Sequence, residues 1–315
     1  MNPASALFGG IVGLRNALYD RRILRIHKLV HPVISVGNIS VGGSGKTPFV
    51  ITLGHLLMER GIKVDVLSRG YGRNSNEVAV VDPNGSPDQF GDEPLLIARR
   101  LGVPVIVGAD RYKAGLLAEQ KFPQNTLHLL DDAFQHRRLH RDFDIVLVSD
   151  EDLGESLLPA GRLREPFSSL NRADAVVLSS DSVLPVAGKK VWRVRRQIHF
   201  LGPMTRVVAF CGIARPAQFF AGLKKLGMEL VETITFPDHH SYRQGDIDRL
   251  LRARDRGQAQ GFITTDKDAI NLGLLLKQLR TFETAGLEME LQNPAETVTA
   301  MLHTLEQRCG FRASS

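Results

Sequence analysis

An apolar run, a glycine-rich turn and an amphipathic stretch follow one another between residues 33 and 60. Residues 33–36 have the composition of a buried strand. Residues 49–60 repeat their apolar side chains at helical spacing, and Gly61 follows as a stop signal. A strand that passes through a tight turn into a helix is the building unit of α/β folds. This feature predicts a parallel sheet covered by helices.

The same alternation continues along the first two-thirds of the chain. Seven short segments are apolar on both faces, as expected of parallel strands between helices. They are residues 33–36, 63–67, 78–81, 103–107, 126–130, 144–148 and 173–178. Repeated units of this kind predict a doubly wound sheet that binds its ligand at the carboxyl ends of the strands. The expected fold class is α/β, with a mostly parallel sheet of the phosphate-loop NTPase type.

The pattern breaks near residues 181–205, a stretch rich in proline, glycine and lysine with a short alternating segment at 191–198. A shorter series then begins, with strands expected at 206–211, 229–235 and 261–265 and helices at 216–226 and 244–256. We therefore expect four parts: an amphipathic segment over 1–30, a nucleotide-binding domain over 31–185, a linker over 186–205 and a smaller α/β domain over 206–315.

The turn itself has the chemistry of a phosphate-binding loop. Backbone N–H groups bind phosphate oxygens, and glycine lets the backbone approach closely. Lys46 supplies a cation for the β- and γ-phosphates, and the Thr47 hydroxyl is a ligand for Mg²⁺. The strict pattern has glycine where this chain has Ser40, and the mechanism tolerates that change. The predicted nucleotide contacts are Ser40, Val41, Gly42, Gly43, Ser44, Gly45, Lys46 and Thr47.

A second metal ligand is expected where a neighbouring strand ends. Residues 126–130 run into Asp131 and Asp132. In phosphate-loop enzymes an aspartate at this place holds Mg²⁺ directly or through water. An aspartate pair that caps a turn is the alternative, and the phosphate loop favours the metal.

Two segments contain candidates for a base toward an acceptor hydroxyl. Asp92 lies in the Gly-Asp-Glu-Pro segment that opens a helix, where it is either an N-cap or a base. His239 lies in a Pro-Asp-His-His segment after a strand of the second series, where a structural histidine is the simpler interpretation. Spacing alone leaves both residues open.

Composition limits the partners. A 43% share of hydrophobic residues supports a folded core, and the net charge of +6 fits an acidic ligand, an anionic membrane or nucleic acid. The chain has 6% aromatic residues and a short basic run at 136–141 without interleaved aromatics, which disfavours nucleic acid. The two cysteines, Cys211 and Cys309, lack metal-ligand spacing and are expected to be free thiols.

The N-terminus combines an apolar stretch at residues 5–19 with basic residues that follow it. A signal peptide carries its charge before the apolar stretch, so this order disfavours a secretion signal. No apolar run reaches the length that crosses a bilayer. We expect an interfacial helix on an anionic membrane surface, with a helix packed on the domain as the alternative.

Two other nucleotide-dependent functions are weighed against a kinase. Residues 264–268 resemble the guanine-reading pattern of GTPases, but Asp268 follows Lys267 directly, without the intervening residue. A metal-centre or cofactor-insertion NTPase predicts clusters of cysteine and histidine, and the sequence contains none. Phosphoryl transfer to an acceptor remains the preferred function.

Seven short motifs together resemble the tetraacyldisaccharide 4'-kinase family of lipid A synthesis. They are residues 37–48, 68–72, 91–94, 131–136, 161–166, 237–239 and 265–268. The Asp-Asp-x-Phe-Gln-His motif at 131–136 is the most specific of them, and the family usually has glycine where this chain has Ala133. An alanine methyl group is tolerated there unless the residue is left-handed.

The resemblance implies transfer of the ATP γ-phosphate to the 4'-hydroxyl of a tetraacylated glucosamine disaccharide 1-phosphate. It also implies Mg²⁺, a peripheral position on the cytoplasmic face of the inner membrane, and two α/β/α domains joined by a short β linker. By the same resemblance, Asp92 is the base and His239 its partner, while Thr47, Asp131, Asp132 and Glu165 serve the metal. The expected substrate contacts are Arg69, Arg111 and Arg164.

Overall fold

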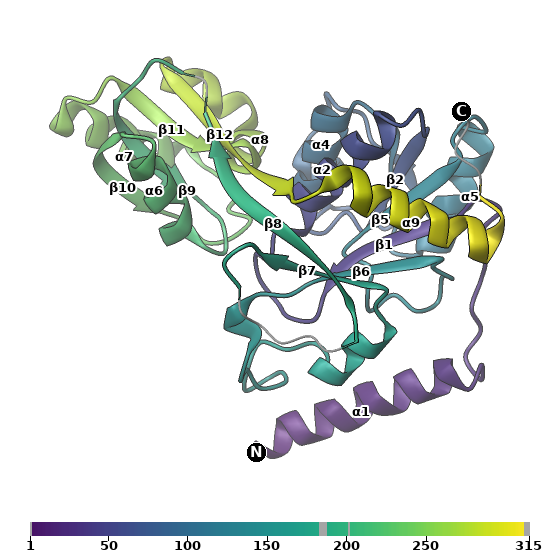
Figure 1. Ribbon diagram of the computed structural model, residues 1–315. Coiled ribbons are helices and arrows are strands. Elements are labelled where there is room, and N and C mark those ends of the chain that lie inside the picture. The colour runs from purple at the N-terminus through teal and green to yellow at the C-terminus, as the bar shows by residue number, and fades with distance from the viewer. Residues whose placement is uncertain (1, 183–187, 201, 312–315) are drawn as a thin grey trace.

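The structure is a computed structural model that describes residues 2–182, 188–200 and 202–311 (Figure 1). Its strands form one twelve-stranded sheet in the order β10-β9-β11-β12-β8-β7-β6-β1-β5-β2-β4-β3. The strands are β1 Val33–Asn38, β2 Val64–Ser68, β3 Ala79–Val80, β4 Val105–Val107, β5 Leu127–Asp131, β6 Phe143–Leu147, β7 Ala175–Ser179, β8 Lys190–His199, β9 Arg206–Cys211, β10 Glu229–Thr235, β11 Gly261–Thr265 and β12 Phe282–Leu291.

Helices cover both faces of this sheet. The α-helices are α1 Pro3–Asp20, α2 Lys46–Met58, α3 Pro87–Phe90, α4 Asp92–Leu101, α5 Arg111–Lys121, α6 Pro216–Lys225, α7 Gln244–Gly257, α8 Asp266–Leu272 and α9 Pro294–Cys309. Three 3₁₀ segments complete the assignment in the described residues, namely η1 Asp150–Asp152, η2 Phe167–Arg172 and η3 Gly273–Leu279. The α/β fold class is confirmed.

The predicted strands occur within two or three residues of their expected bounds. The central strands β1, β2, β5 and β6 are buried at every position, which explains why most of their residues are apolar. Strand β3 is an exception to the expected parallel arrangement, because it pairs antiparallel with β4. It lies at the edge of the sheet, where an antiparallel strand commonly completes a parallel sheet.

Two long strands connect the larger part of the molecule, which contains β1 to β7 and α2 to α5, with the smaller part, which contains β9 to β11 and α6 to α8. Strand β8 starts parallel to β7 and continues antiparallel to β12. Strand β12 starts parallel to β11 and ends on β8. Within the segment expected to be a linker, residues 190–199 are therefore a strand, and Figure 1 shows β8 and β12 crossing between the two parts. The junction is part of the sheet itself.

The end of the chain returns to the larger part. Helix α9 contributes Val298, Met301 and Leu305 to the same core as α2. Arg60 after α2 donates hydrogen bonds to Thr299 Oγ1 and to the carbonyl of Ala295. The expectation that residues 206–315 form one C-terminal domain therefore needs correction at its end. The apolar face of α9 finds its partner on α2, and sequence position did not indicate that partner.

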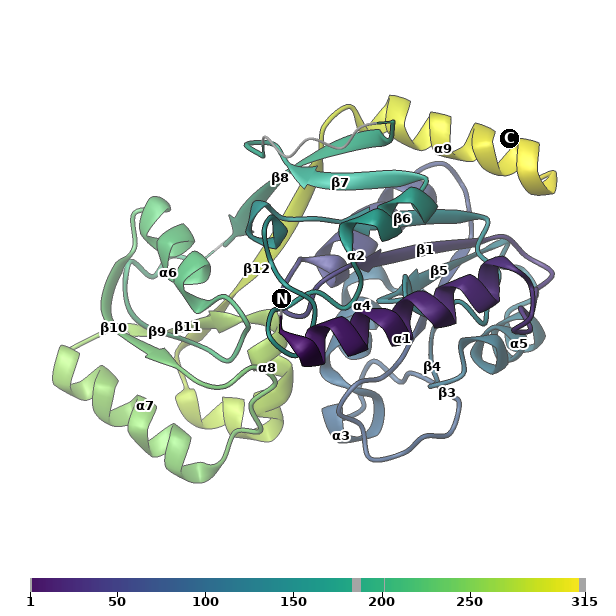
Figure 2. The same ribbon diagram turned by 90° about the horizontal axis from the view of Figure 1, so that it is seen from below.

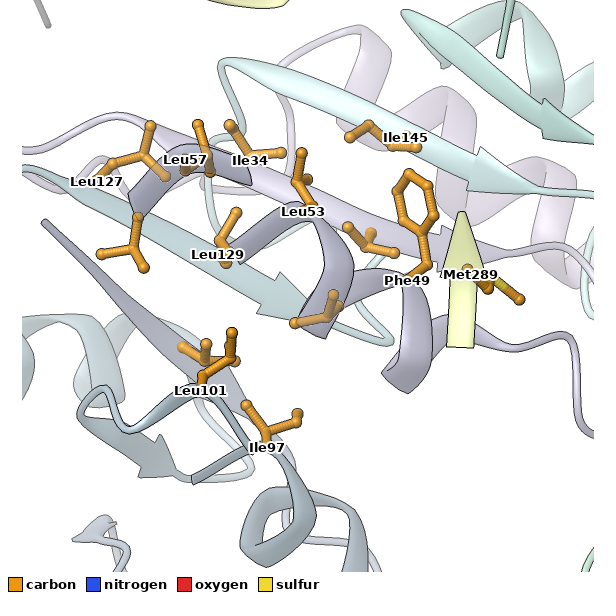
Figure 3. Close-up of a cluster of buried hydrophobic side chains, with 14 of the residues drawn as sticks. Ile34, Phe49, Leu53, Leu57, Ile97, Leu101, Leu127, Leu129, Ile145 and Met289 are labelled. Atoms are coloured by element: carbon orange, nitrogen blue, oxygen red, sulfur yellow. The ribbon is translucent and has the colours of Figure 1, made fainter. Parts of the chain in front are cut away.

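The largest core lies between α2 and the central strands (Figure 3). Leu53 and Leu57 point from α2 toward Ile34 of β1 and Leu129 of β5, and Phe49 points toward Ile145 of β6. Met289 of β12 and Ile97 of α4 close the cluster at its edges. This packing fixes the start of α2 relative to the end of β1, and the glycine-rich turn connects those two points.

Helix α1 runs along one side of the larger part, apart from the main layers (Figures 1 and 2). Asn2 caps its first turn by accepting a hydrogen bond from the Ala4 N–H, and only Ser5 and Val12 of the helix are buried. Among the residues that the structure describes, no helix has both the length and the hydropathy of a membrane span.

Candidate active site

The glycine-rich turn connects β1 to the first residue of α2. Gly45 is left-handed, with φ of 86°, and a Cβ atom there would lie 1.9 Å from Met289 Cε. Glycine adopts this conformation without the strain that a residue with a Cβ atom would have. The first N–H groups of α2 and the partial positive charge of its N-terminus make the turn an anion site. The sequence prediction of a phosphate loop thus has the local geometry that it requires.

Two arginines hold this turn from outside. Arg162 Nη2 donates to the carbonyl of Val41 at 3.1 Å, and Arg196 Nη2 from β8 donates to the carbonyl of Ser44 at 2.8 Å. The Val41 N–H donates in turn to the carbonyl of Arg162 at 2.8 Å, and the Ser44 N–H donates to the carbonyl of Gly42 at 2.9 Å, so these contacts fix the shape of the turn. The sequence reasoning did not single out either arginine as a loop contact. Arg162 lies beside the predicted Arg164, which was the available signal.

Asp132 connects the loop to Arg164. Its carboxylate lies 3.5 Å from Lys46 Nζ and 3.1 Å from Arg164 Nη1. Burial opposes ionisation here, but the charges of Lys46 and Arg164 outweigh it and lower the pKa of Asp132. The structure therefore brings three predicted site residues into one charged cluster.

Asp131 ends β5 and is 1% exposed. Ser68 Oγ lies 3.4 Å from its Oδ2, and its buried Oδ1 has no hydrogen-bond partner in the described residues. Burial raises the pKa of Asp131 to about 7, and the nearby charges of Glu93 and Asp132 act in the same direction. A bound cation would stabilise the ionised form of this buried carboxylate, because one of its oxygens is unpaired and its neighbours are acidic.

These residues fit Mg²⁺ in donor chemistry. Mg²⁺ takes oxygen ligands and usually keeps several waters, with one or two carboxylates and phosphate oxygens completing its shell. Within residues 2–182, 188–200 and 202–311, no group of three or more histidine, cysteine, aspartate or glutamate side chains is arranged to hold a metal. A site made of Asp131, the buried Thr47 hydroxyl and the phosphates of a nucleotide matches the habit of this ion.

Two further predicted arginines lie at the same edge of the sheet. Arg111 begins α5 and is buried, donating to the carbonyls of Gly108 and Ala109. Burial lowers the pKa of Arg111 to about 10, and the charges of Asp131 and Arg69 act on it as well. Arg69 follows β2 and is exposed. Arg111 thus lies close to the carboxylates of Asp131 and Asp132, and Arg69 lies close to Arg111.

Glu165 has a different place from the one expected. Its buried carboxylate accepts from Asn16 Nδ2 at 2.9 Å and pairs with Arg15 at 3.3 Å and Arg172 at 2.9 Å. Both of its oxygens are therefore engaged with α1 and η2. The contacts make Glu165 one of the residues that fasten α1 to the larger part, and its role at Mg²⁺ stays a prediction.

A second cluster joins the two parts of the molecule. His239 Nδ1, from the loop after β10, lies 2.9 Å from Asp92 Oδ2 at the start of α4. Asn271 Nδ2 of α8 donates to the same oxygen at 3.1 Å, and Lys267 Nζ lies 3.7 Å from it. Gly91 holds the N-cap position, so Asp92 is the first residue of the helix.

The charges of this cluster keep Asp92 ionised. Burial opposes the charged form, but the hydrogen bond with His239 and the charge of Lys267 outweigh it and lower the pKa of Asp92 to about 2. The same hydrogen bond raises the pKa of His239, which Lys267 opposes. An ionised carboxylate that is held by donors on one oxygen can accept a proton or a hydrogen bond on the other.

Lys267 and Asn271 were not among the predicted site residues. Lys267 belongs to the motif at 265–268, which indicated its presence but no role. Asn271 lies one helical turn beyond Lys267 on α8, where nothing in the sequence distinguishes it from a surface residue. Their function becomes visible only when α8 and α4 are brought together.

The site has a phosphate loop at the end of β1, an aspartate pair at the end of β5, and a carboxylate–imidazole pair made by Asp92 and His239. These features define the class of protein, which is a phosphate-loop kinase. A family model described as Tetraacyldisaccharide-1-P 4'-kinase matches residues 1–306. The chain belongs to this family, and its activity is the phosphorylation of a tetraacyldisaccharide at the 4' position. The alternative of a metal-centre or cofactor-insertion NTPase has no support.

Individual relatives extend over almost the whole chain. Tetraacyldisaccharide 4'-kinase of Koribacter versatilis is 49% identical, covering 98% of this chain and 100% of the relative. The protein of the same name from Aquifex aeolicus is 42% identical over 86% of this chain and 88% of the relative. A crystal structure of the "apo" form of LpxK from Aquifex aeolicus in complex with ATP matches with a TM-score of 0.79 and 36% identity, covering 96% of this chain and 98% of the other.

Ala133 does not conflict with this assignment. It is buried and is not among the residues with positive φ, whereas Asp132 before it has φ of 49°. The left-handed position is therefore taken by an aspartate, a residue type that tolerates it better than most. A methyl group at 133 needs no strained backbone.

Proposed function

We propose that the edge of the sheet around Lys46, Asp92 and Asp131 transfers the γ-phosphate of ATP to the 4'-hydroxyl of a tetraacylated glucosamine disaccharide 1-phosphate. One observation supports this arrangement above the others. Glu93, the neighbour of Asp92 on α4, is close enough to Asp131 to raise its pKa. The first turn of α4, which carries the proposed base, thus lies near the carboxylate that would serve the metal.

The turn from Gly42 to Thr47 would hold the phosphates of ATP. Backbone N–H groups at the start of α2 bind the phosphate oxygens, and Lys46 neutralises charge on the group to be transferred. Thr47 and Asp131 would hold Mg²⁺, which supplies further charge neutralisation on the phosphates when bound. Arg111 and Arg164 lie near these carboxylates, Arg69 lies near Arg111, and the three are proposed as contacts for the substrate phosphates.

Asp92 would orient the acceptor hydroxyl and take its proton. Its Oδ2 faces His239 and Asn271, while its Oδ1 accepts only the Glu93 N–H at 2.8 Å among the described contacts, so Oδ1 keeps a lone pair for the hydroxyl. In the reaction the acceptor oxygen bonds to the γ-phosphorus, the bond from that phosphorus to the ADP oxygen breaks, and the proton passes to Asp92. A loose transition state asks for orientation more than for a strong base, which suits a low pKa.

Helix α1 is proposed to dock the enzyme on the membrane that contains its lipid substrate. Leu7, Ile11 and Leu14 are 60–68% exposed on this helix. A band of exposed basic residues follows them, namely Arg21, Arg22, Arg25 and Lys28. Apolar side chains beside cations are the combination that binds an anionic bilayer surface. A peripheral position on the cytoplasmic face of the inner membrane fits this surface, and it accounts for the basic composition without nucleic acid.

The test uses ATP labelled at the γ-phosphate, the purified disaccharide lipid and identification of the phosphorylated position. We expect label at the 4'-oxygen. Asp92→Ala lowers kcat by about 10²–10⁴-fold with the KM for ATP nearly unchanged, whereas Lys46→Ala impairs the use of ATP. Asp88→Ala, an exposed carboxylate on the neighbouring α3, is the matched control. Full activity of the Asp92 variant would remove that residue from the mechanism.

A further inference from the structure

Lys267 lies between four groups that belong to the cluster around Asp92. Its Nζ is 3.2 Å from His239 Nε2 and 3.2 Å from Asp238 Oδ1. The same ammonium is 3.7 Å from Asp92 and 3.9 Å from Glu93. The side chain is 15% exposed, so these contacts are largely shielded from solvent. Burial opposes its charge, but the three carboxylates outweigh that effect and raise the pKa of Lys267, which keeps it an ammonium ion.

An ammonium group determines which nitrogen of His239 carries the proton. It has three donors and no acceptor, so at 3.2 Å the Nε2 atom of His239 must be the acceptor. The ring proton then resides on Nδ1, which lies 2.9 Å from Asp92 and donates to it. A doubly protonated ring would direct its Nε2–H at the ammonium, which is unfavourable for both groups.

The first turn of α8 holds Lys267 in this place. Thr265 caps the helix by accepting from the Asp268 N–H at 3.1 Å. The buried Asp268 in turn accepts from the Gly212 N–H at 2.9 Å and from the Tyr242 hydroxyl at 2.8 Å. Three segments of the smaller part are thereby held together by the Asp268 carboxylate. The backbone of Lys267, the residue before Asp268, is therefore fixed in position.

The backbone of His239 indicates that its position is imposed. His239 has φ of 57°, in the left-handed region that is costly for a residue with a Cβ atom. Its N–H donates to Asp238 Oδ1 at 3.1 Å, and Tyr71 of the larger part contacts the ring with centroids 5.3 Å apart. Lys267 binds that same Asp238 oxygen, so it holds both the imidazole and the turn that presents it.

We propose that Lys267 is a positioning residue of the kinase, which holds His239 as the neutral tautomer with its proton on Nδ1. In that state His239 donates to Asp92 Oδ2 and leaves Asp92 Oδ1 for the acceptor hydroxyl. Lys267 itself remains an ammonium ion and exchanges no proton in the reaction. The kinetic part of this inference rests on the proposed function, whereas the tautomer is a property of the enzyme without substrate.

The tautomer is measured by ¹⁵N NMR of the enzyme labelled at histidine, with His239→Gln to assign the signal. The wild-type signal is expected to be that of the Nδ1–H form. In Lys267→Met the ring loses its donor at Nε2, so the Nε2–H and doubly protonated forms become populated. Removal of the cation leaves Asp92 and Asp238 facing the ring, with Tyr71 as the uncharged neighbour, so the pKa of His239 rises.

Kinetics with the same variants separate positioning from a purely structural role. Lys267→Met is expected to lower kcat by about 10- to 100-fold with the KM for ATP within about twofold of wild type. Lys267→Arg, which keeps a charged donor, recovers part of the tautomer and of kcat. Lys224→Met, an exposed lysine of α6, leaves both unchanged and is the control. Thermal unfolding of each variant confirms that it is folded.

An unchanged tautomer and pKa of His239 in folded Lys267→Met would overturn the inference, and so would a kcat equal to that of the control. Failure of the proposed function has a different signature. It would appear as full activity in Asp92→Ala, while the NMR result on His239 and Lys267 would stay readable.

Discussion

Two residues of the site carry left-handed backbone. Asp132 has φ of 49° and His239 has φ of 57°, and each lies within one of the motifs shared with the family. Such conformations persist only where surrounding contacts determine them, and they collect at functional sites. Here the contacts are the ion pairs of Asp132 with Lys46 and Arg164, and the hydrogen bonds of His239 with Asp92 and Lys267. Strain and function coincide at both positions.

A third charged cluster is buried away from the site and has consequences for stability. His128 of β5 is fully buried, with Nδ1 2.7 Å from Asp65 Oδ1 and Nε2 3.4 Å from Glu119 Oε1. Burial opposes protonation, but these two carboxylates outweigh it and raise the pKa of His128 to about 9. Glu119 also accepts from the N–H groups of Val30 and His31, which ties the segment after α1 to α5.

This cluster predicts a loss of stability at alkaline pH. Because the pKa of His128 in the folded state is above that of an unfolded histidine, its contribution is complete below about pH 6.5 and is lost as the pH rises through about 9. Its size is on the order of 3 kcal/mol. Urea unfolding of wild type and His128→Gln measures it, as a difference in unfolding free energy that shrinks between these pH values. A difference that stays constant would show that His128 is neutral in the fold.

At the scale of elements, α1 combines a polar attachment with an apolar outer face. Arg15 and Asn16 bind Glu165, Ser5 Oγ donates to the carbonyl of Leu157, and Arg137 donates to the carbonyl of Asn16. Glu165 is adjacent to Arg164, which pairs with Asp132 of the site. Polar contacts give this helix one orientation, and that orientation leaves its apolar side chains exposed. The helix is therefore fixed to the enzyme while remaining available to a bilayer.

The apolar face of α1 predicts binding to lipid vesicles. Replacing Leu7, Ile11 and Leu14 together by serine removes apolar area that would enter the bilayer, so we expect partition into anionic phospholipid vesicles to fall by at least about 100-fold. Leu274→Ser, at a leucine of η3 that is 82% exposed, is the control and keeps wild-type partition. Sedimentation with vesicles makes the comparison, and equal partition of the triple variant and the control would exclude α1 as the contact.

Local patterns predicted elements well and long-range partners poorly. The buried strands and the turn at 37–47 could be predicted because apolar runs and glycines report directly on local structure. Strand β12 was not predicted, because Glu288 and Glu290 at its exposed positions weaken the apolar pattern and its partner β8 lies far away in sequence. The packing of α9 on α2 was missed for the same reason. Amphipathic periodicity indicates that one face of a helix is buried, but it does not indicate which element covers that face.

The site shows the same division. Lys46, Thr47, Asp131 and Asp132 follow from the loop and the strand end, whereas spacing left Asp92 and His239 open. Those two residues are 147 positions apart and meet only in the tertiary structure. The resemblance to the kinase family paired them before the geometry did. Lys267 and Asn271 needed the geometry itself, since their roles depend on the contact between α8 and α4.

At the scale of the whole molecule, one sheet extends through both parts and carries the two halves of the site. Strands β8 and β12 connect those parts, and both touch the phosphate loop through Arg196 and Met289. The ion pair of Arg100 with Asp266, at 2.7 Å, adds a direct contact between α4 and α8. A movement of the smaller part would therefore separate His239 from Asp92 and disturb the loop together. In the arrangement where His239 contacts Asp92 the two parts are closed over the site, and such closure would exclude water from the transferred phosphate.

The central claim is that Asp92 on one part and His239 on the other act as one unit in phosphoryl transfer. A double-mutant cycle with Asp92→Asn, His239→Gln and the combined variant tests it, with kcat for the disaccharide lipid as the measured quantity. If the pair acts as a unit, the double variant is no slower than the slower single variant, within about twofold. Effects that multiply in the double variant would mean that the two residues act independently, and would contradict the account.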